Sequence, residues 1–499
     1  MSELLESHVL PFGFAKRHGV VVIPAAVSGA PTEMLYLEGL KAQILAEVRR
    51  VSDSGLTLRL VDQSTFDQHL SDAYQNDSDA AMQMIEDLGE EVDLSRLAEA
   101  IPETGDLLDQ QDDAPIIKLI NSLLTEAVKV GASDIHIETY ETRLVVRFRV
   151  DGVLREIVSP RRALAPLLVS RIKVMAKLDI AEKRLPQDGR ISVRVGGKEV
   201  DVRVSTIPAS NGERVVMRLL DKQEGRRDLS HLGMSPADMD SMSTLIKRPH
   251  GILLVTGPTG SGKSTTLYAF LDQLNDRSRN ILTVEDPIEY DIEGIGQTQV
   301  NVKAEMTFAK GLRAILRQDP DVVMVGEIRD LETAEIAVKA AQTGHLVLST
   351  LHTNDAPQTL NRLVQMGIPP FNIAASVLLI MAQRLARKLC EHCKQGHELP
   401  DHILLDTGFN KEELEDLKIY DHSPTGCERC TDGYRGRIGI FQVMPISDEI
   451  RRLILNGGDT DQLAEQARAE GIKDMRESGI EKIRQGITSI AEINRITRE

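Results

Sequence analysis

Eight consecutive residues near the middle of the chain have the types and spacing of a phosphate-binding loop. The run Gly257-Pro-Thr-Gly-Ser-Gly-Lys-Ser264 matches G-x-x-x-x-G-K-[ST], in which glycines let successive backbone N–H groups point at an anion. We expect Lys263 to reach the β- and γ-phosphates of a nucleoside triphosphate and Ser264 to hold Mg²⁺. An ordinary glycine-rich turn is the alternative. The candidate nucleotide contacts here are Gly257, Pro258, Thr259, Gly260, Ser261, Gly262, Lys263, Ser264 and Thr265.

Acidic residues follow two other apolar runs. The run that begins at Asp321 ends in Glu327, and residues 281–284 are followed by Glu285 and Asp286. Ligands of open α/β sheets bind at the carboxyl ends of the strands, so these acids should share an edge with the phosphate loop. A lone acid after a strand is usually a capping or solvated residue. Two of them beside a phosphate loop favour catalysis, with Glu327, Glu285 and Lys263 as the catalytic candidates.

Two histidines bracket a further apolar run. His345 and His352 are seven residues apart, which on a regular strand would put them on opposite faces, but His352 falls in the loop after Thr350. One of them could sense the γ-phosphate, so both are kept as nucleotide-contact candidates. For isolated histidines, a core or surface role is the default.

The four cysteines of the chain lie in one short region. Cys390 and Cys393 form one Cys-x-x-Cys pair, and Cys427 and Cys430 form another. Four thiolates in paired knuckles suit tetrahedral Zn²⁺, and in a reducing compartment such pairs indicate metal before disulfide. We predict structural zinc, with a redox dithiol as the alternative. Because four thiolates leave no open coordination position, the metal is assigned no catalytic role.

The elements that would position these residues can be read from the same region. A strand over 252–255 precedes the phosphate loop, and a helical pattern through Thr265, Leu267 and Ala269 follows it. Short apolar runs, each followed by a loop and a helical segment, occupy 251–256, 280–284, 321–325 and 345–350. Near-continuous apolar strands with crossover helices indicate a parallel sheet that is buried on both faces. We predict an α/β domain over 236–499, with a zinc-binding insertion at about 388–435.

Three segments precede this domain. Residues 1–80 are predicted to form a small mixed domain, with strands at 20–23 and 56–61. Residues 81–113 are predicted to be an acidic helix and linker, because eleven acids and one base, Arg96, lie between Glu86 and Asp113. Residues 114–235 are predicted to form an α+β domain. Its signals are a helical stripe over 116–128, an alternating strand over 143–150, the turn Asp151-Gly152 and a hairpin over 191–204.

Composition restricts the classes of function. The formal charge is −17 and aromatic residues make up 3%, which argues against nucleic-acid binding, although one basic face can be hidden in an acidic total. No stretch of about 18 apolar residues occurs, so no membrane-spanning helix is predicted. Residues 1–6 carry acids where a signal peptide would carry bases. We predict a cytoplasmic protein whose membrane attachment, if any, is indirect and comes through a partner.

Longer segments around these residues resemble the motifs of secretion ATPases. Residues 282–290 resemble their acidic "Asp box", residues 311–330 their long Walker B region, and residues 343–354 their "His box". Together with the cysteines and the segment Gly131-Ala-Ser-Asp-Ile-His-Ile-Glu138, these motifs make the chain similar to the type II secretion ATPases. The resemblance is strongest from about Asp112 to the C-terminus. It implies a RecA-like P-loop ATPase domain with a tetracysteine zinc insertion, preceded by smaller α+β N-terminal domains.

The resemblance also implies an activity and partners. Such ATPases form homohexamers on the cytoplasmic face of the bacterial inner membrane. There, ATP hydrolysis drives assembly of a pilus-like fibre, the pseudopilus, and thereby the export of folded proteins. The first domain docks on the cytoplasmic domain of an inner-membrane platform protein of the L type. Motion of the hexamer would turn a polytopic platform protein of the F type.

Roles for single residues follow from the same resemblance. Glu327 takes the Walker B position, and Glu285 lies in the acidic box near the attacking water. The arginines that would reach the phosphates are Arg203 and Arg218 in the second domain and Arg313 and Arg317 in the ATPase domain. For each arginine, a surface ion pair is the alternative. The expected mechanism is a cleft that the arginines close on the γ-phosphate and that opens after hydrolysis.

Three other functions remain open from the sequence. A type IV pilus extension ATPase has the same core and chemistry but builds a different fibre. A RecA-like motor on nucleic acid would need a basic channel, and its ATPase activity would be stimulated by DNA or RNA. A zinc-stabilised scaffold would bind nucleotide without turnover, which the carboxylates of Glu285 and Glu327 argue against.

Overall fold

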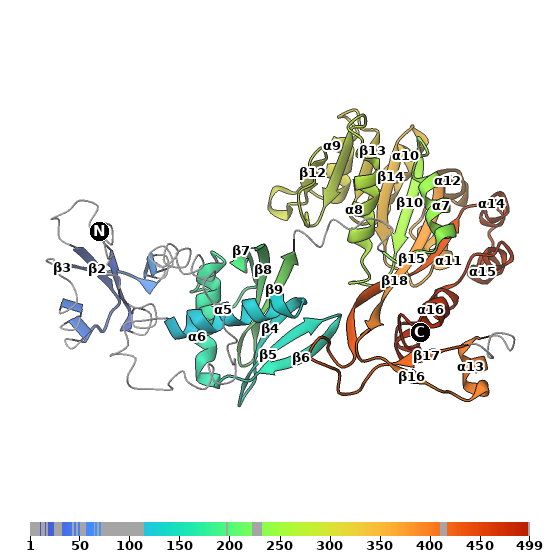
Figure 1. Cartoon of the computed structure of the whole chain (residues 1–499). Coiled ribbons are helices and arrows are strands. Elements are labelled where there is room, and N and C mark those ends of the chain that lie inside the picture. Colours follow the sequence, from blue (N-terminus) through green and yellow to red (C-terminus); the bar gives the residue numbers. More distant parts are fainter. Residues whose placement is uncertain are drawn as a thin grey trace. The chain divides into compact units, whose positions relative to one another are not determined.

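The computed structural model describes residues 114–195, 198–221, 232–409 and 417–497, together with short stretches between residues 10 and 70. The chain forms two compact units, Met1–Lys222 and Gln223–Glu499 (Figure 1). The predicted domain limits at 80 and 113 fall outside the described residues, as does the acidic segment between them. Those limits, and the domain start at 236, stay predictions.

A small three-stranded sheet lies near the N-terminus of the first unit. Its strands are β1 (Val20–Ile23), β2 (Thr32–Tyr36) and β3 (Leu56–Leu60), in the order β1-β2-β3. β1 and β2 are antiparallel, whereas β2 and β3 are parallel. The two strands predicted in this region are therefore confirmed.

Residues 114–221 of the first unit, where the structure describes them, form a six-stranded antiparallel sheet with two α-helices. The elements are α5 (Ala114–Lys129), β4 (Ala132–Thr139), β5 (Leu144–Val150), β6 (Val153–Val158), α6 (Ala165–Met175), β7 (Gln187–Val195), β8 (Lys198–Ala209) and β9 (Gly212–Asp221). The strand order is β6-β5-β4-β9-β8-β7. Between β5 and β6, Asp151 and Gly152 both have positive φ, 49° and 85°, as the predicted hairpin turn requires. The predicted helix, alternating strand and second hairpin are also confirmed.

The two faces of this sheet differ in chemistry. One face carries apolar side chains that pack under α5 and α6, including Ile135, Phe148 and Val202. Successive side chains of a strand point to opposite faces, so the intervening positions form the other face. Arg203 and Arg218, directly opposite each other on β8 and β9, belong to that second face.

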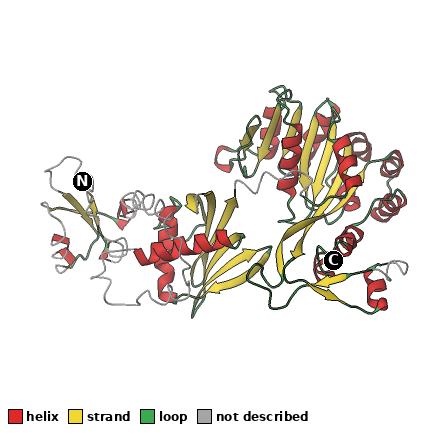
Figure 2. Cartoon of the chain, in the orientation of Figure 1, coloured by secondary structure: helices red, strands yellow, loops and turns green. Residues whose placement is uncertain are grey.

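The second unit is built on a seven-stranded sheet in which strands alternate with helices (Figure 2). Its strands are β10 (Gly251–Thr256), β11 (Ile281–Glu285), β12 (Gly296–Gln299), β13 (Val322–Val325), β14 (Leu346–Leu351), β15 (Val377–Leu389) and β18 (Tyr434–Pro445). The order is β12-β11-β13-β14-β10-β15-β18, and all neighbours are parallel except β15 and β18. The predicted parallel sheet is confirmed, and all four predicted strands lie side by side in it.

Helices cover both faces of this sheet. On one side lie α7 (Pro236–Leu245) and α8 (Lys263–Leu274). The other side carries α9 (Phe308–Ile315), α10 (Leu331–Gln342), α11 (Ala356–Gln365), α12 (Pro370–Ser376), α14 (Asp448–Leu455), α15 (Thr460–Ala469), α16 (Met475–Arg484) and α17 (Ile490–Thr497). The side chains of Ser235, Asp330 and Asp355 cap the first turns of α7, α10 and α11.

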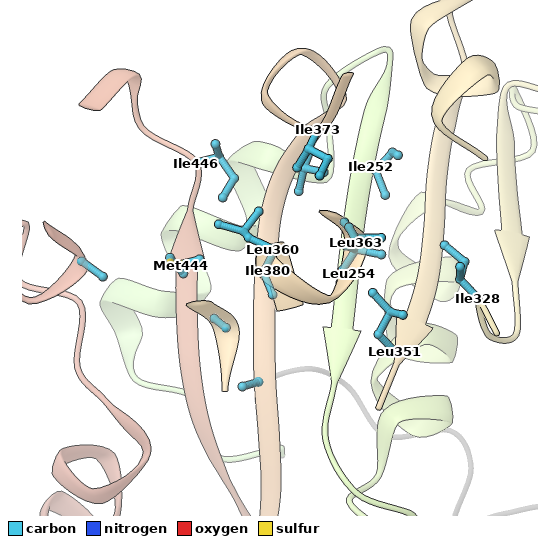
Figure 3. Packing of buried hydrophobic residues seen from close by; sticks show 14 of the residues in the cluster. Ile252, Leu254, Ile328, Leu351, Leu360, Leu363, Ile373, Ile380, Met444 and Ile446 are labelled. Atoms are coloured by element: carbon cyan, nitrogen blue, oxygen red, sulfur yellow. The ribbon is translucent and has the colours of Figure 1, made fainter. Parts of the chain in front are cut away.

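Aliphatic side chains from many elements form the core on the second side. Figure 3 shows Leu254, Leu363 and Ile380 close together between the sheet and its helices. A smaller insertion connects β15 to β18 and contains β16 (Gln395–His397), α13 (Asp401–Thr407) and β17 (Ile419–Asp421). Within the described ranges, no helix is both long and apolar enough to cross a membrane.

Candidate active site and metal centre

The phosphate loop lies between β10 and α8, in the strand–loop–helix setting that its motif requires. Gly257, Gly260 and Gly262 have positive φ values of 147°, 80° and 89°. A Cβ atom on Gly257 would lie 2.3 Å from the carbonyl oxygen of Gln383, so only glycine fits there. Gly262 is the N-cap of α8 and brings no capping side chain. The first N–H groups of the helix can therefore bind an anion.

Lys263 is folded back onto the loop that it follows. Its Nζ donates to the carbonyl oxygens of Gly257 at 2.8 Å and of Pro258 at 3.1 Å. Burial lowers the pKa of Lys263, and the negative charge of Glu327 opposes that effect. The ammonium group thus lies where phosphate oxygens could replace the two carbonyl acceptors. Ser264, the next residue, is exposed.

Glu327 lies just after the carboxyl end of β13, with a side chain that is 14% exposed. It forms an ion pair with Arg329, and its Oε2 lies 3.3 Å from Nε2 of His352. Because Glu327 also acts electrostatically on Lys263, the structure brings the lysine, the carboxylate and His352 to one edge of the sheet. Arg329 lay inside the Walker B segment, but the sequence reasoning gave it no role.

Glu285 ends β11 and points into the protein, where it is only 4% exposed. Its Oε1 accepts hydrogen bonds from Thr283 Oγ1 at 2.5 Å and from Gln297 Nε2 at 3.1 Å. Its Oε2 accepts a hydrogen bond from the hydroxyl of Tyr268, on α8. The sequence placed Glu285 correctly at the edge of the sheet but gave no signal for these three partners.

The two candidate histidines lie at opposite ends of β14. His345 precedes the strand: its ring Nδ1 is 2.9 Å from the carbonyl oxygen of Ala340, and its own carbonyl accepts from the N–H of Gly251 at the start of β10. The phosphate loop follows the opposite end of β10. Because six residues of strand span about 20 Å, His345 lies about that far from the loop. The prediction that His345 contacts a nucleotide at this loop is therefore wrong. His352 stays a candidate, because it lies on the edge that carries Glu327.

The arginines of the second unit lie on the surface of α9 and just after it. Nη1 of Arg313 is 2.6 Å from Oε1 of Glu332, and Nη1 of Arg317 donates to the carbonyl oxygen of Arg313 at 2.9 Å. The side chains of Arg313 and Glu332 are about half exposed, at 50% and 57%. Among the described contacts, neither arginine touches the phosphate loop. Their roles toward phosphate stay predictions.

In the first unit, Arg203 and Arg218 are neighbours across β8 and β9. Arg218 is 59% exposed and its Nε lies 2.8 Å from Oδ1 of Asp134, whose Oδ2 lies 3.5 Å from Nε of Arg149. Arg203 is half-buried. Phosphate contact by either arginine stays a prediction.

Hydroxyl and amide side chains that were not predicted fix the loops around the phosphate site. The hydroxyls of Thr256 and Thr353 are 2.7 Å apart, and that of Thr353 is 2.6 Å from the hydroxyl of Thr359. Gln383 accepts a hydrogen bond from Thr266 of α8 at 2.7 Å. Thr353 belongs to the His box segment, which was its only signal in the sequence, whereas Gln383 had none.

The four cysteines converge as predicted, at the base of the insertion between β15 and β18. Their sulfur atoms all lie within 4.8 Å of one another, with 3.8 Å between Cys390 and Cys427 and 3.6 Å between Cys393 and Cys430. Around a tetrahedral ion with Zn–S distances of about 2.3 Å, neighbouring sulfurs lie about 3.8 Å apart. The backbone N–H of Cys427 donates to the sulfur of Cys430 at 3.2 Å. The donor set therefore fits zinc.

Comparisons with known protein families cover nearly the whole chain. Residues 109–495 match the family described as "Type II/IV secretion system protein". Residues 9–74 match the family of an N-terminal domain of "GSPII protein E". The two matches leave only short segments of the chain outside either family.

Individual relatives are similar over their full length. "Type II secretion system protein E" of Pseudomonas aeruginosa is 56% identical over 495 residues, which cover 98% of this chain and 96% of the relative. "Type II secretion system ATPase E" of Vibrio cholerae is 55% identical, with 98% and 97% covered. Among solved structures, "Crystal Structure of the Pilus Retraction Motor PilT and Bound ADP" has a TM-score of 0.51 and 26% identity, covering 76% of this chain and 95% of that one.

Proposed function

Because this chain belongs to the family of type II secretion ATPases, we propose that its loop Gly257–Thr265 binds the ATP whose hydrolysis powers secretion. The predicted activity and its place in type II secretion are confirmed, in preference to a pilus extension ATPase or a nucleic-acid motor. The observation that carries our assignment of the site is the grouping of Lys263, Glu327 and His352 beside the phosphate loop.

Lys263 exchanges its present acceptors for phosphate oxygens when ATP enters. Its ammonium group already lies at the loop, held by two backbone carbonyls, so the exchange breaks no ion pair with a carboxylate of the described residues. The hydroxyl of Ser264 and the carboxylate of Glu327 are oxygen donors that would hold Mg²⁺. That ion, when bound, neutralises charge on the β- and γ-phosphates.

Glu285 and Glu327 have different roles in hydrolysis. Glu285 accepts the proton of the attacking water, a role supported by the three described donors that hold its carboxylate at the end of β11. Glu327 orients the bound γ-phosphate. His352 contacts the carboxylate of Glu327, so that the presence or absence of the γ-phosphate affects the end of β14. Contact of Arg203, Arg218, Arg313 and Arg317 with phosphate belongs to the same proposal.

The assembly and its partners are proposed from the family. The chain acts as a homohexamer at the cytoplasmic face of the bacterial inner membrane, where it drives assembly of the pseudopilus. Its N-terminal residues dock on the cytoplasmic domain of an L-type platform protein, which the match of residues 9–74 to an N-terminal domain of the family supports. The hexamer acts on an F-type polytopic platform, and its attachment to the membrane is indirect. A structural Zn²⁺ is held by Cys390, Cys393, Cys427 and Cys430, as the sulfur spacing supports.

Steady-state ATPase assays on the full-length chain test the site. We expect Lys263→Ala, Glu285→Gln and Glu327→Gln each to lower kcat by at least about 100-fold. Only Lys263→Ala should also weaken binding of a fluorescent ATP analogue by a large factor. Light scattering in the same buffer measures the oligomeric state, so the activity of hexamers can be compared with that of smaller species. Undiminished ATPase activity of Lys263→Ala would contradict the assignment of the loop.

A further inference from the structure

The hydroxyl of Tyr268 lies at the centre of a buried polar network. Tyr268 belongs to α8 and is 1% exposed. Its oxygen accepts a hydrogen bond from the backbone N–H of Glu289 at 3.1 Å, and its proton is donated to Oε2 of Glu285. Burial, followed by the charge of Glu285, raises the pKa of Tyr268, so the phenol remains a donor throughout the neutral range.

Gln297 closes the same network from β12. Its Oε1 accepts from the N–H of Ile292 at 2.8 Å, which fixes the orientation of the amide. The amide nitrogen therefore faces Oε1 of Glu285 at 3.1 Å and the carbonyl oxygen of Tyr290 at 3.1 Å. With Thr283 as a third donor, the described partners fix the carboxylate in one rotamer.

The ring of Tyr268 is held independently of its hydroxyl. It meets the ring of Tyr290 edge-on, with centroids 4.7 Å apart and an angle of 75° between the planes. Its other neighbours form the apolar cluster between α8 and the sheet, which includes Leu271 and Met324. Replacement by phenylalanine therefore removes the hydrogen bond to Glu285 and the acceptor of the Glu289 N–H and the Gln297 amide, and it leaves the packing in place.

Tyr268 also lies on the helix that the phosphate loop begins. It follows Lys263 by five residues, which is about 7.5 Å along a helix. One rigid element thus carries the lysine at its first residue and the partner of Glu285 little more than one turn later. We propose that Tyr268 is a positioning residue for ATP hydrolysis, whose hydroxyl holds the carboxylate of Glu285 in register with the phosphate loop. This inference rests on the proposed role of Glu285.

The direct test is Tyr268→Phe in the full-length ATPase. We expect kcat to fall by about 10-fold, because small errors in the position of a catalytic group are costly, while KM for ATP changes by less than about two-fold. Binding of a fluorescent ATP analogue should also be unchanged. The matched control is Tyr434→Phe, which removes another buried hydroxyl, 2.7 Å from Ser489, and should leave kcat unchanged. Melting temperatures of both variants show whether either change acts through folding.

A double-variant cycle separates positioning from general damage. If Tyr268 acts through Glu285, Tyr268→Phe should cost nothing further in the Glu285→Gln background. An equal fall of kcat in both backgrounds, or an unchanged kcat in Tyr268→Phe, would overturn the inference alone. Undiminished activity of Glu285→Gln would instead refute the proposed role of Glu285, and this inference with it.

Discussion

Replacing Glu492 with glutamine should destabilise the second unit more than any comparable change on its surface. The side chain of Glu492, on α17, is 0% exposed and is bonded by two arginines. Arg387 donates through Nε at 3.0 Å, Nη2 at 2.8 Å and its backbone N–H at 2.9 Å. Arg495 donates through Nε at 2.8 Å and Nη2 at 2.6 Å. Glutamine would turn one acceptor into a donor that faces an arginine.

The size of the effect follows from the pKa. Burial by itself raises the pKa of Glu492, but the hydrogen bonds from Arg495 and Arg387 outweigh it and bring the pKa to about 2, against an ordinary 4.5. That difference corresponds to about 3 kcal/mol of stability at neutral pH. Arg495 is half exposed, so solvent screening reduces the figure to about 2 kcal/mol. For a unit of this size, we expect a fall in Tm of about 4 °C.

The assay is thermal unfolding of the full-length chain, followed by a signal that resolves the second unit. The matched control is Glu449→Gln, which removes the same charge from an ion pair with Arg452 whose side chains are 56% and 68% exposed. The control should shift Tm by about 1 °C or less. A shift for Glu492→Gln no larger than that of the control would refute the energetic reasoning.

The pH dependence gives a second check with a definite sign. The carboxylate of Glu492 has a lower pKa in the folded chain than in the unfolded chain, so its contribution is fully present above about pH 4.5. It is lost as the pH falls from there toward 2. The difference in Tm between the parent chain and Glu492→Gln should therefore shrink between pH 6 and pH 3. A difference that stays constant over this range would contradict the assignment of the ion pair.

Three further predictions concern the nucleotide and metal sites. Gly257→Ala should abolish binding of a fluorescent ATP analogue, because its Cβ would meet the carbonyl oxygen of Gln383 at 2.3 Å, whereas the same change at Gly344, where a Cβ meets nothing within 4 Å, should not. Purified protein should contain one zinc per chain by atomic absorption, and Cys393→Ser should lose the metal and lower Tm by several degrees. His352→Ala should reduce kcat by about 10-fold and His345→Ala by less than two-fold in an ATPase assay, since only His352 contacts Glu327. Full zinc retention by Cys393→Ser, or equal effects of the two histidine variants, would count against these assignments.

The features that the sequence predicted well are those fixed by local pattern. The strand before the phosphate loop and the strand before Glu327 are short, apolar and buried on both faces, so their composition alone identified them. The hairpin turn at Asp151 was predictable because few residue pairs adopt two positive φ values. The cysteines were predictable because their spacing matches one metal chemistry.

The features that the sequence did not predict depend on partners that are distant in the chain. β15 runs over Val377–Leu389, but the polar residues Gln383, Arg384 and Arg387 interrupt its apolar pattern. Their partners come from α8, the loop after β14 and α17, which no local pattern reveals. The position of His345, by contrast, followed from the predicted parallel sheet, because His345 precedes β14 and ligands bind at the opposite, carboxyl end of the strands.

β15 also has a mechanical consequence. The carbonyl oxygen of Gln383 lies against Gly257 in the phosphate loop, and the same strand leads through Leu389 directly to Cys390. Seven residues of strand span about 23 Å, so a tilt of about 5° at Gln383 would displace Cys390 by about 2 Å. Antiparallel pairing with β18 stiffens this span against bending. One strand thus connects the nucleotide loop to the cysteine cluster without an intervening loop.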